Sequence, residues 1–450
     1  MNIHTLQLHN FRRFADDTFR FHPQFTILIG NNGFGKTTIL DALSIMMSAY
    51  LVEFHARWER TILPEEVRLQ IYEKTDGVPV REPQYPVHLY ITGTLHGESV
   101  QWKQSIRQRE HAGLPIREVE EILVHSRRDQ QSVQDGEDIN LPFLGYYGPG
   151  RVWPKNGHVE IEKPGSRTLG YENCLDPSSD QRLFAKWFKQ LELSAVQRHT
   201  RIGVLESVRE AVKTCIPGAR HFFYDAMTDE LMIALEQENY CLFNNLSDGY
   251  RNMVAMVADI AHRVARLNPH LGADAAGETS GVVLIDEIDL HLHPQWQRRV
   301  VGDLQRAFPQ IQFIATTHSP FILQSLAPGE VIDLNQGDLR GSGVRVTEAI
   351  RAEPPPEAEY SNKSIEDITE EVMGVEVPQR SRRYQAMFDA AKRYYALLEQ
   401  GKDVDPQEKQ RIKTRLDELS SPFSDNVAYH AFLEMERMAA GLGKSEKEDR

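Results

Sequence analysis

The sequence predicts an α/β fold built on a parallel sheet that carries a phosphate-binding loop. Residues 30–37, GNNGFGKT, match the phosphate-loop pattern. They follow the apolar run 25–29, which is typical of a buried strand, and precede a segment over 37–44 that favours a helix. Two further apolar runs, 282–285 and 312–316, are typical of central parallel strands. Ligands gather at the carboxyl ends of such strands, so the motifs that follow these runs are the candidate functional residues.

The phosphate loop predicts a site for a nucleoside triphosphate with Mg²⁺. Its glycines let consecutive N–H groups and the positive end of the helix face a phosphate. Lys36 is expected to reach the β- and γ-phosphates, and the Thr37 hydroxyl to hold Mg²⁺. The predicted nucleotide-binding residues of this segment are Gly30, Asn31, Asn32, Gly33, Phe34, Gly35, Lys36, Thr37 and Thr38.

Composition limits the class of protein. A chain of 450 residues with 40% hydrophobic content can bury a large core in two or three structural units. No stretch reaches the roughly 18 apolar residues of a membrane span, and the first residues read as a strand rather than a signal peptide. Cys174, Cys215 and Cys241 lack metal-ligand spacing, which is typical of a reduced cytoplasmic protein. The net charge of -14 limits any contact with nucleic acid to local basic patches.

Two predicted strands open the chain as a hairpin close to the nucleotide. Residues 3–9 alternate apolar and polar side chains, and a second strand is expected over 17–21. Arg12 or Arg13 would then touch adenine or phosphate; a solvated arginine at the end of a strand is the alternative.

The middle of the chain is predicted to add antiparallel strands and a helical lobe. Residues 107–140 are polar and charged, with interleaved acids, which indicates an exposed, solvated insertion more than a DNA-binding patch. The expected elements are strands over 87–95, 98–105 and 141–147, helices over 179–217, and further strands over 221–242.

A second helix start can also bind an anion. Ser247 can cap a helix expected over 253–267, and Gly249 leaves its first N–H groups open. An ordinary helix cap is the alternative interpretation. The position of this helix start before the acidic motif described next favours the anion site.

Carboxylates and a histidine follow the two central strands. Asp286 is expected to reach Mg²⁺ directly or through water, and Glu287 to act as the base that polarises the attacking water. His318 follows the next strand and is placed to hydrogen-bond the γ-phosphate or that water. His291 and His293 have metal-ligand spacing but no third ligand, which disfavours a metal site there.

Together these motifs resemble the ABC-type ATPases of the RecF, SMC and Rad50 branch over residues 1–336, an AAA-like ATP-binding domain. The resemblance implies ATP as the nucleotide, Lys36, Glu287 and His318 as catalytic residues, and Thr37 and Asp286 as Mg²⁺ ligands. It also implies a dimer or higher homo-oligomer that sandwiches nucleotide between two heads. The residues that would then bind nucleotide from the second motif are Ser247, Asp248, Gly249 and, in the D-loop, Asp289.

Two features depart from that branch or remain open. No glutamine can be assigned to the family's Q-loop. The segment between the phosphate loop and Ser247 has no sustained heptad repeat, so no SMC-like or Rad50-like arm is expected. The predicted head is therefore compact, with a modest helical lobe over about 179–217.

The tail carries a second resemblance. Residues 337–362, with Pro354–Pro356, are expected to form a linker, and 363–450 an all-helical, partner-binding region. Met373–Val375 and Pro378–Tyr384 resemble the ATPase subunit of Septu-type anti-phage systems, the PtuA family with its retron-encoded relatives. That resemblance implies an HNH nuclease partner of the PtuB type and, in retron systems, a reverse transcriptase with its RNA–DNA product.

The resulting expectation is an ATP-hydrolysing defence subunit that regulates a separate nuclease. A RecF-like or Rad50-like DNA repair ATPase and an ATP-stabilised scaffold without turnover are the alternatives. Asp403 and Asp405 form the only acidic pair in the tail that suggests a nuclease metal site, and they lie between predicted helices rather than after a strand. Self-contained cleavage is therefore not expected.

Overall fold

The structure is a computed structural model, and it divides by contacts into Met1–Ile368 and Thr369–Arg450. It describes residues 1–54, 60–73, 79–107, 116–150, 165–177, 182–235, 240–335, 360, 363–371, 411 and 414. The expected linker over 337–362 and most of the expected helical region over 363–450, including both tail motifs and the Asp403–Asp405 pair, lie outside the described residues. The described residues contain no helix long and apolar enough to cross a membrane.

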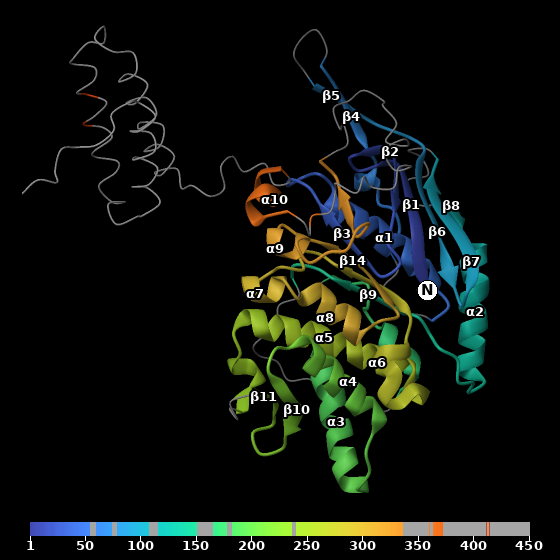
Figure 1. Cartoon of the computed structure of the whole chain (residues 1–450). Coiled ribbons are helices and arrows are strands. Elements are labelled where there is room, and N and C mark those ends of the chain that lie inside the picture. Colours follow the sequence, from blue (N-terminus) through green and yellow to red (C-terminus); the bar gives the residue numbers. More distant parts are fainter. Residues whose placement is uncertain are drawn as a thin grey trace, which may run out of the picture. The chain divides into compact units, whose positions relative to one another are not determined.

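A five-stranded parallel sheet forms the centre of the first unit (Figure 1). Four of its strands are buried along their whole length, as their continuous apolar runs predict. The strand order is β15 (Val331–Asp333), β3 (Phe25–Ile29), β14 (Ile311–Thr316), β13 (Gly281–Ile285) and β9 (Phe143–Tyr147). The phosphate-loop strand β3 thus lies beside β14, and β14 beside β13, so the three predicted motifs end at one edge of the sheet.

A second, antiparallel sheet lies over the helix that follows the phosphate loop. Its strand order is β2 (Phe14–Arg20), β1 (Asn2–Phe11), β6 (Val87–Leu95), β7 (Glu98–Ile106) and β8 (Ile116–Glu118). Helix α1 (Lys36–Leu51) contacts β13 and β14 on one side and β6 and β7 on the other. It therefore lies between the two sheets, and all but three of its sixteen residues are buried.

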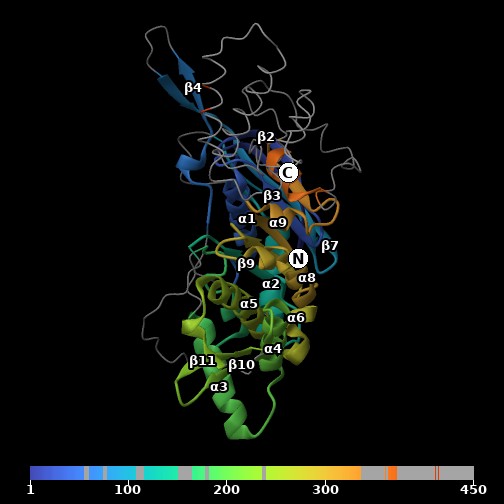
Figure 2. The same cartoon turned by 60° about the vertical axis from the view of Figure 1, so that its left-hand side comes forward.

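The described part of the segment 107–140 is largely exposed, as expected, but one face of it is packed. It contains helix α2 (Glu120–Gln134), which packs against α1 and β7 (Figure 2). The buried stripe of this helix consists of Ile122, Ser126 and Asp129, and two of these residues are polar. Tyr50 donates a 2.6 Å hydrogen bond to Asp129, and Ser126 donates one of 2.6 Å to the Tyr50 carbonyl. Polar residues in the buried stripe hide the helical periodicity, because the pattern that predicts an amphipathic helix counts apolar side chains.

Helices α3 (Arg182–Arg198) and α4 (Gly203–Cys215) occupy the position of the expected helical lobe. They pack with a three-stranded antiparallel sheet, β10 (Ala219–Asp225), β11 (Glu230–Leu235) and β12 (Tyr240–Leu242). Helix α5 (Asp248–Leu267) contacts α4 and β9 and joins this lobe to the central sheet. The α/β fold class, with its mixed arrangement of parallel and antiparallel sheets, is confirmed.

A two-stranded ribbon projects at the upper end of the first unit in Figures 1 and 2. It consists of β4 (Leu69–Glu73) and β5 (Pro79–Pro83). The remaining elements are α6 (Ala275–Glu278), α7 (Pro294–Gln297), α8 (Val300–Ala307), α9 (Pro320–Leu323), α10 (Ile365–Glu371), and the 3-10 helices η1 (Pro64–Glu66), η3 (Arg167–Tyr171), η4 (Phe243–Asn245) and η5 (Pro269–Asp274). Ser364 and Asp367 cap α10 reciprocally through side chain and backbone.

Candidate nucleotide-binding site

The phosphate loop turns from β3 into α1 through three glycines with positive φ. Gly30, Gly33 and Gly35 have φ values of 148°, 81° and 94°, in the region that favours glycine. Gly35 precedes α1, and no side chain caps the first turn of that helix. The N–H groups of this turn therefore keep the arrangement that binds phosphate. Asn31 and Asn32 are exposed at the apex of the loop, and Thr38 is half-buried in the first turn.

Lys36 is a buried cation within the loop. Its Nζ atom donates to the carbonyls of Gly30 at 2.6 Å and Asn31 at 3.4 Å. Burial lowers the pKa of Lys36, while the nearby carboxylates, with Asp286 first among them, raise it. The ammonium thus lies among carbonyls in the position from which it can bind a triphosphate.

Thr37 and Asp286 meet between the phosphate loop and β13. The Thr37 hydroxyl donates to Asp286 Oδ2 at 2.9 Å. Thr316, the last residue of β14, donates its hydroxyl to the other carboxylate oxygen, Oδ1, at 2.6 Å. A hydroxyl and a carboxylate oxygen in contact are the ligand types that Mg²⁺ takes beside nucleotide phosphates. The predicted metal pair is therefore brought together and fits the ion.

Glu287 begins the turn that follows β13. Its φ is 52°, which a residue with a side chain adopts only at a cost of about 1–2 kcal/mol. Its backbone N–H donates to the Thr316 hydroxyl at 2.7 Å, and the side chain is half-buried. Strain at a turn next to a metal pair is typical of a functional site.

Asp289 ties the segment after Glu287 to the end of β14. Its Oδ1 atom accepts from the Thr317 hydroxyl at 2.6 Å and from the backbone N–H of His318 at 3.3 Å. His318 is exposed at this edge of the sheet. The ring is nevertheless partly shielded from water, and this partial burial and the charge of Lys36, in that order, lower the pKa of His318, so its neutral form is favoured near neutral pH.

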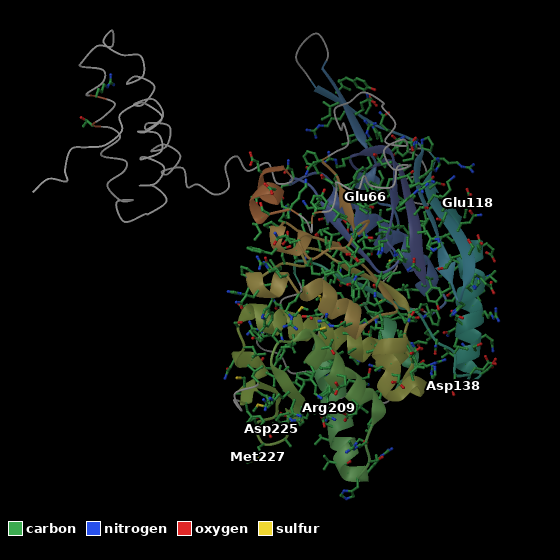
Figure 3. The ribbon with its side chains drawn as sticks, viewed as in Figure 1. Glu66, Glu118, Asp138, Arg209, Asp225 and Met227 are labelled. Atoms are coloured by element: carbon green, nitrogen blue, oxygen red, sulfur yellow. The ribbon has the colours of Figure 1, made fainter. Side chains whose placement is uncertain are left out.

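The two arginines considered near the nucleotide have different surroundings. Arg12 is held by Asp41 and Glu66 at 2.7 Å each, and Arg60 binds the same two carboxylates at 2.9 and 3.0 Å. Glu66 lies at the base of the β4–β5 ribbon (Figure 3). Arg13 lies over the phosphate loop instead. Its guanidinium donates to the Gly33 carbonyl and is 4.7 Å from the Phe34 ring centroid.

Ser247 directly precedes helix α5. The helix begins at Asp248, five residues before the expected start, so Asp248 and Gly249 lie in its first turn. Ser247 is exposed and its side chain makes no cap hydrogen bond, so the expected capping is not observed. Asp248 is exposed and pairs with Arg251. A Cβ atom on Gly249 would lie 2.3 Å from the carbonyl oxygen of His291. The glycine is therefore required within this chain by the close approach of the turn after β13.

Strand β9 connects the site to both neighbouring helices. The Tyr147 carbonyl accepts from the Asp286 N–H at 2.8 Å, directly beside the metal pair. On one face of the sheet the Tyr146 hydroxyl lies 3.4 Å from Asp41 of α1, and on the other the Tyr147 hydroxyl donates to Asp259 of α5 at 2.8 Å. Tyr146 and Tyr147 are consecutive in β9, so their side chains point to opposite faces of the sheet.

Comparisons with known proteins find similarity to ATPases. A family model described as "AAA domain" matches residues 5–194, and one described as "AAA domain, putative AbiEii toxin, Type IV TA system" matches 243–324. The chain is 25% identical over 396 residues to a protein named "Retron Vc95 probable ATPase" from Vibrio cholerae, covering 76% of this chain and 74% of the relative. It is 26% identical over 344 residues to "Septu protein PtuA" from Bacillus mycoides, covering 75% of this chain but only 41% of the relative. The predicted resemblance to Septu and retron ATPases is confirmed.

Among solved structures, the SMC head domain from Thermotoga maritima matches with a TM-score of 0.41 and 14% identity. The match covers 72% of this chain and 92% of that domain.

Proposed function

We propose that the chain is the ATP-binding and ATP-hydrolysing subunit of an anti-phage defence complex. In this proposal it forms a dimer or higher homo-oligomer by sandwiching nucleotide, and it regulates a partner HNH nuclease of the PtuB type in the cytoplasm. A retron reverse transcriptase and its RNA–DNA are further partners where the system includes a retron. The similarity to proteins named as retron and Septu ATPases supports the defence role.

The observation that carries the ATPase proposal is the contact of Thr37 with Asp286. These residues are 249 positions apart in the chain, and the parallel sheet brings their oxygens to 2.9 Å. Thr37 and Asp286 are the residues that would hold Mg²⁺, and the ion neutralises charge on the β- and γ-phosphate oxygens. Few arrangements other than a magnesium-nucleotide site require this contact beside a phosphate loop.

Each remaining residue then has a defined task. Lys36 and the N–H groups of the loop bind the phosphates. Glu287 accepts a proton from the attacking water, and the neutral ring of His318 hydrogen-bonds the γ-phosphate or that water. Ser247, Asp248 and Gly249 would bind the nucleotide of a second subunit. Arg13, which lies over the loop, would contact the nucleotide from above, whereas Arg12 is already held by two carboxylates.

The test of hydrolysis is a comparison of the purified protein with Glu287→Gln. We expect the variant to bind a fluorescent ATP analogue normally and to hydrolyse ATP at least about 100-fold more slowly, because the base is lost. Glu98→Gln, an exposed glutamate on β7, is the matched control and should hydrolyse ATP at the wild-type rate. Unchanged turnover in Glu287→Gln would exclude Glu287 as the base.

The partner is tested by purification from the native operon. We expect an HNH nuclease to co-purify with the tagged ATPase and its nuclease activity to change with nucleotide. If DNA ends stimulate ATP hydrolysis and no nuclease is recovered, a repair ATPase is favoured. If the wild type assembles only with ATP but does not hydrolyse it, a scaffold is favoured.

The proposal also divides the chain into a head over 1–336, a linker over 337–362 and a partner-binding region over 363–450. Removal of 363–450 should therefore abolish recovery of the nuclease.

A further inference from the structure

Thr316 makes three hydrogen bonds to the three consecutive residues that follow β13. Its hydroxyl donates to Asp286 Oδ1 at 2.6 Å and accepts from the Glu287 N–H at 2.7 Å. Its carbonyl accepts from the Ile288 N–H at 2.9 Å. Thr316 itself is fully buried at the end of β14. One side chain thus holds both the proposed metal ligand and the backbone of the proposed base.

The two hydroxyl bonds act on different properties of the site. Asp286 has Thr37 on Oδ2 and Thr316 on Oδ1, so the two hydroxyls fix the rotation of the carboxylate from opposite oxygens. Glu287 has a φ of 52°, and such a conformation persists only where surrounding contacts over-determine it. The bond from its N–H to Thr316 is one of those contacts. Strand β14 ends at Thr316, and His318 follows two residues later.

We propose that Thr316 is a positioning residue for the nucleotide site, which orients Asp286 toward Mg²⁺ and keeps the strained turn at Glu287 in its working conformation. The proposal rests on the ATPase function proposed above. Hydrogen-bond partners of metal ligands typically change metal affinity or activity by 10–100-fold when they are removed. Thr316 contacts neither nucleotide nor water in this role and acts only through the two carboxylate residues.

The test uses Thr316→Val, which keeps the shape and removes the hydroxyl, and Thr316→Ser, which keeps the hydroxyl. The control is Thr26→Val. Thr26 is equally buried on the adjacent strand β3, and its hydroxyl accepts from the His22 N–H rather than contacting the metal pair. Each Val variant loses buried hydrogen bonds and is expected to lower the melting temperature. Only Thr316→Val should change the site.

Two readouts are measured. The first is the Mg²⁺ concentration for half-maximal binding of a fluorescent ATP analogue, which we expect to rise about 10–100-fold in Thr316→Val alone. The second is hydrogen–deuterium exchange of the Glu287 amide without nucleotide or metal. That amide should be protected in the wild type, Thr316→Ser and Thr26→Val, and should exchange faster in Thr316→Val.

Three results would overturn the proposal. One is a Thr316→Val protein that matches Thr26→Val in both readouts. Another is a Thr316→Ser protein as impaired as Thr316→Val, because packing of the methyl group would then be the cause. The third needs no variant: a Glu287 amide that exchanges in the wild type as fast as an exposed amide. Hydrogen–deuterium exchange is measured without nucleotide or metal. If the wild type did not hydrolyse ATP, the proposed ATPase function would fail, but the exchange test of Thr316 could still be carried out.

Discussion

The Tyr147 hydroxyl donates to Asp259 Oδ2 at 2.8 Å, and Arg263 donates to the same oxygen at 2.8 Å. All three side chains are buried. Arg263 also donates to the carbonyls of Gly170 and Glu172. The end of strand β9, which accepts the Asp286 N–H, is thus anchored to helix α5 through a buried charge pair whose hydrogen bonds extend to η3 and its C-terminal end.

Removal of the carboxylate from this pair should destabilise the protein strongly. In Asp259→Asn the Arg263 charge remains buried without its counterion, and we expect a loss of about 3–5 kcal/mol in the free energy of unfolding, measured by urea denaturation. Asp229→Asn is the matched control, because its ion pair with Lys189 is exposed and should be worth less than about 1 kcal/mol. Equal losses in the two variants would show that the buried pair does not anchor β9.

The buried His262 predicts a loss of stability in mild acid. Burial lowers the pKa of His262 below its ordinary value of 6.5, although Asp259 opposes this shift. Below about pH 6.5 the unfolded chain therefore binds a proton that the folded chain refuses, and the free energy of unfolding falls as the pH falls. Burial would raise the pKa of Asp259, but Arg263, His262 and Tyr147 together outweigh it and lower that pKa to about 2, so this carboxylate's contribution is lost only in stronger acid.

The measurement is urea unfolding of the wild type and His262→Phe between pH 8 and 5. The ring of His262 lies among Trp187 and Phe184, so phenylalanine is accommodated by its surroundings. We expect the variant to lose less stability than the wild type over this range, by at most about 1.4 kcal/mol per pH unit. Parallel curves for the two proteins would contradict the assignment.

Substitutions of Gly249 and Ser247 are predicted to have different effects on stability and ATP hydrolysis. Gly249→Ala places a methyl group against the His291 carbonyl and should cost about 1–3 kcal/mol of stability, seen as a lower melting temperature. Ser247→Ala removes an exposed hydroxyl that makes no cap bond and should leave the melting temperature unchanged. ATP hydrolysis should nevertheless fall in Ser247→Ala if a second subunit uses this hydroxyl. A Gly249→Ala protein as stable as the wild type would refute the intramolecular role of the glycine.

The sequence was most informative where a motif and the strand before it are adjacent in the chain. The loop at 30–37, the run through Glu287 and the strand before His318 each contain their own local signal, and all three ends meet as expected. The strands predicted over 87–95 and 98–105 are also confirmed, the second ending one residue later, because their alternation and the turn between them are local.

What the sequence did not indicate depends on contacts between distant segments. Thr316 looks like any β-branched strand residue, and its role is visible only once β14 lies beside β13. The four-residue cluster of Arg12, Asp41, Arg60 and Glu66 combines residues from α1, η1, the turn after β1 and the segment before η1, with no shared spacing. The start of α5 was placed too late because Gly249 and Asp248 lower helix propensity, while packing against the turn after β13 overrides it.

The start of helix α5 also carries an aromatic contact. Tyr250 packs edge-to-face against Trp296 of α7, with ring centroids 3.9 Å apart. Indole emission responds to its immediate surroundings, and the chain has only five tryptophans. Any displacement of the Ser247 segment relative to α7 would therefore alter the intrinsic fluorescence of the unlabelled protein, which supplies a native optical reporter for movements of this segment in stopped-flow experiments.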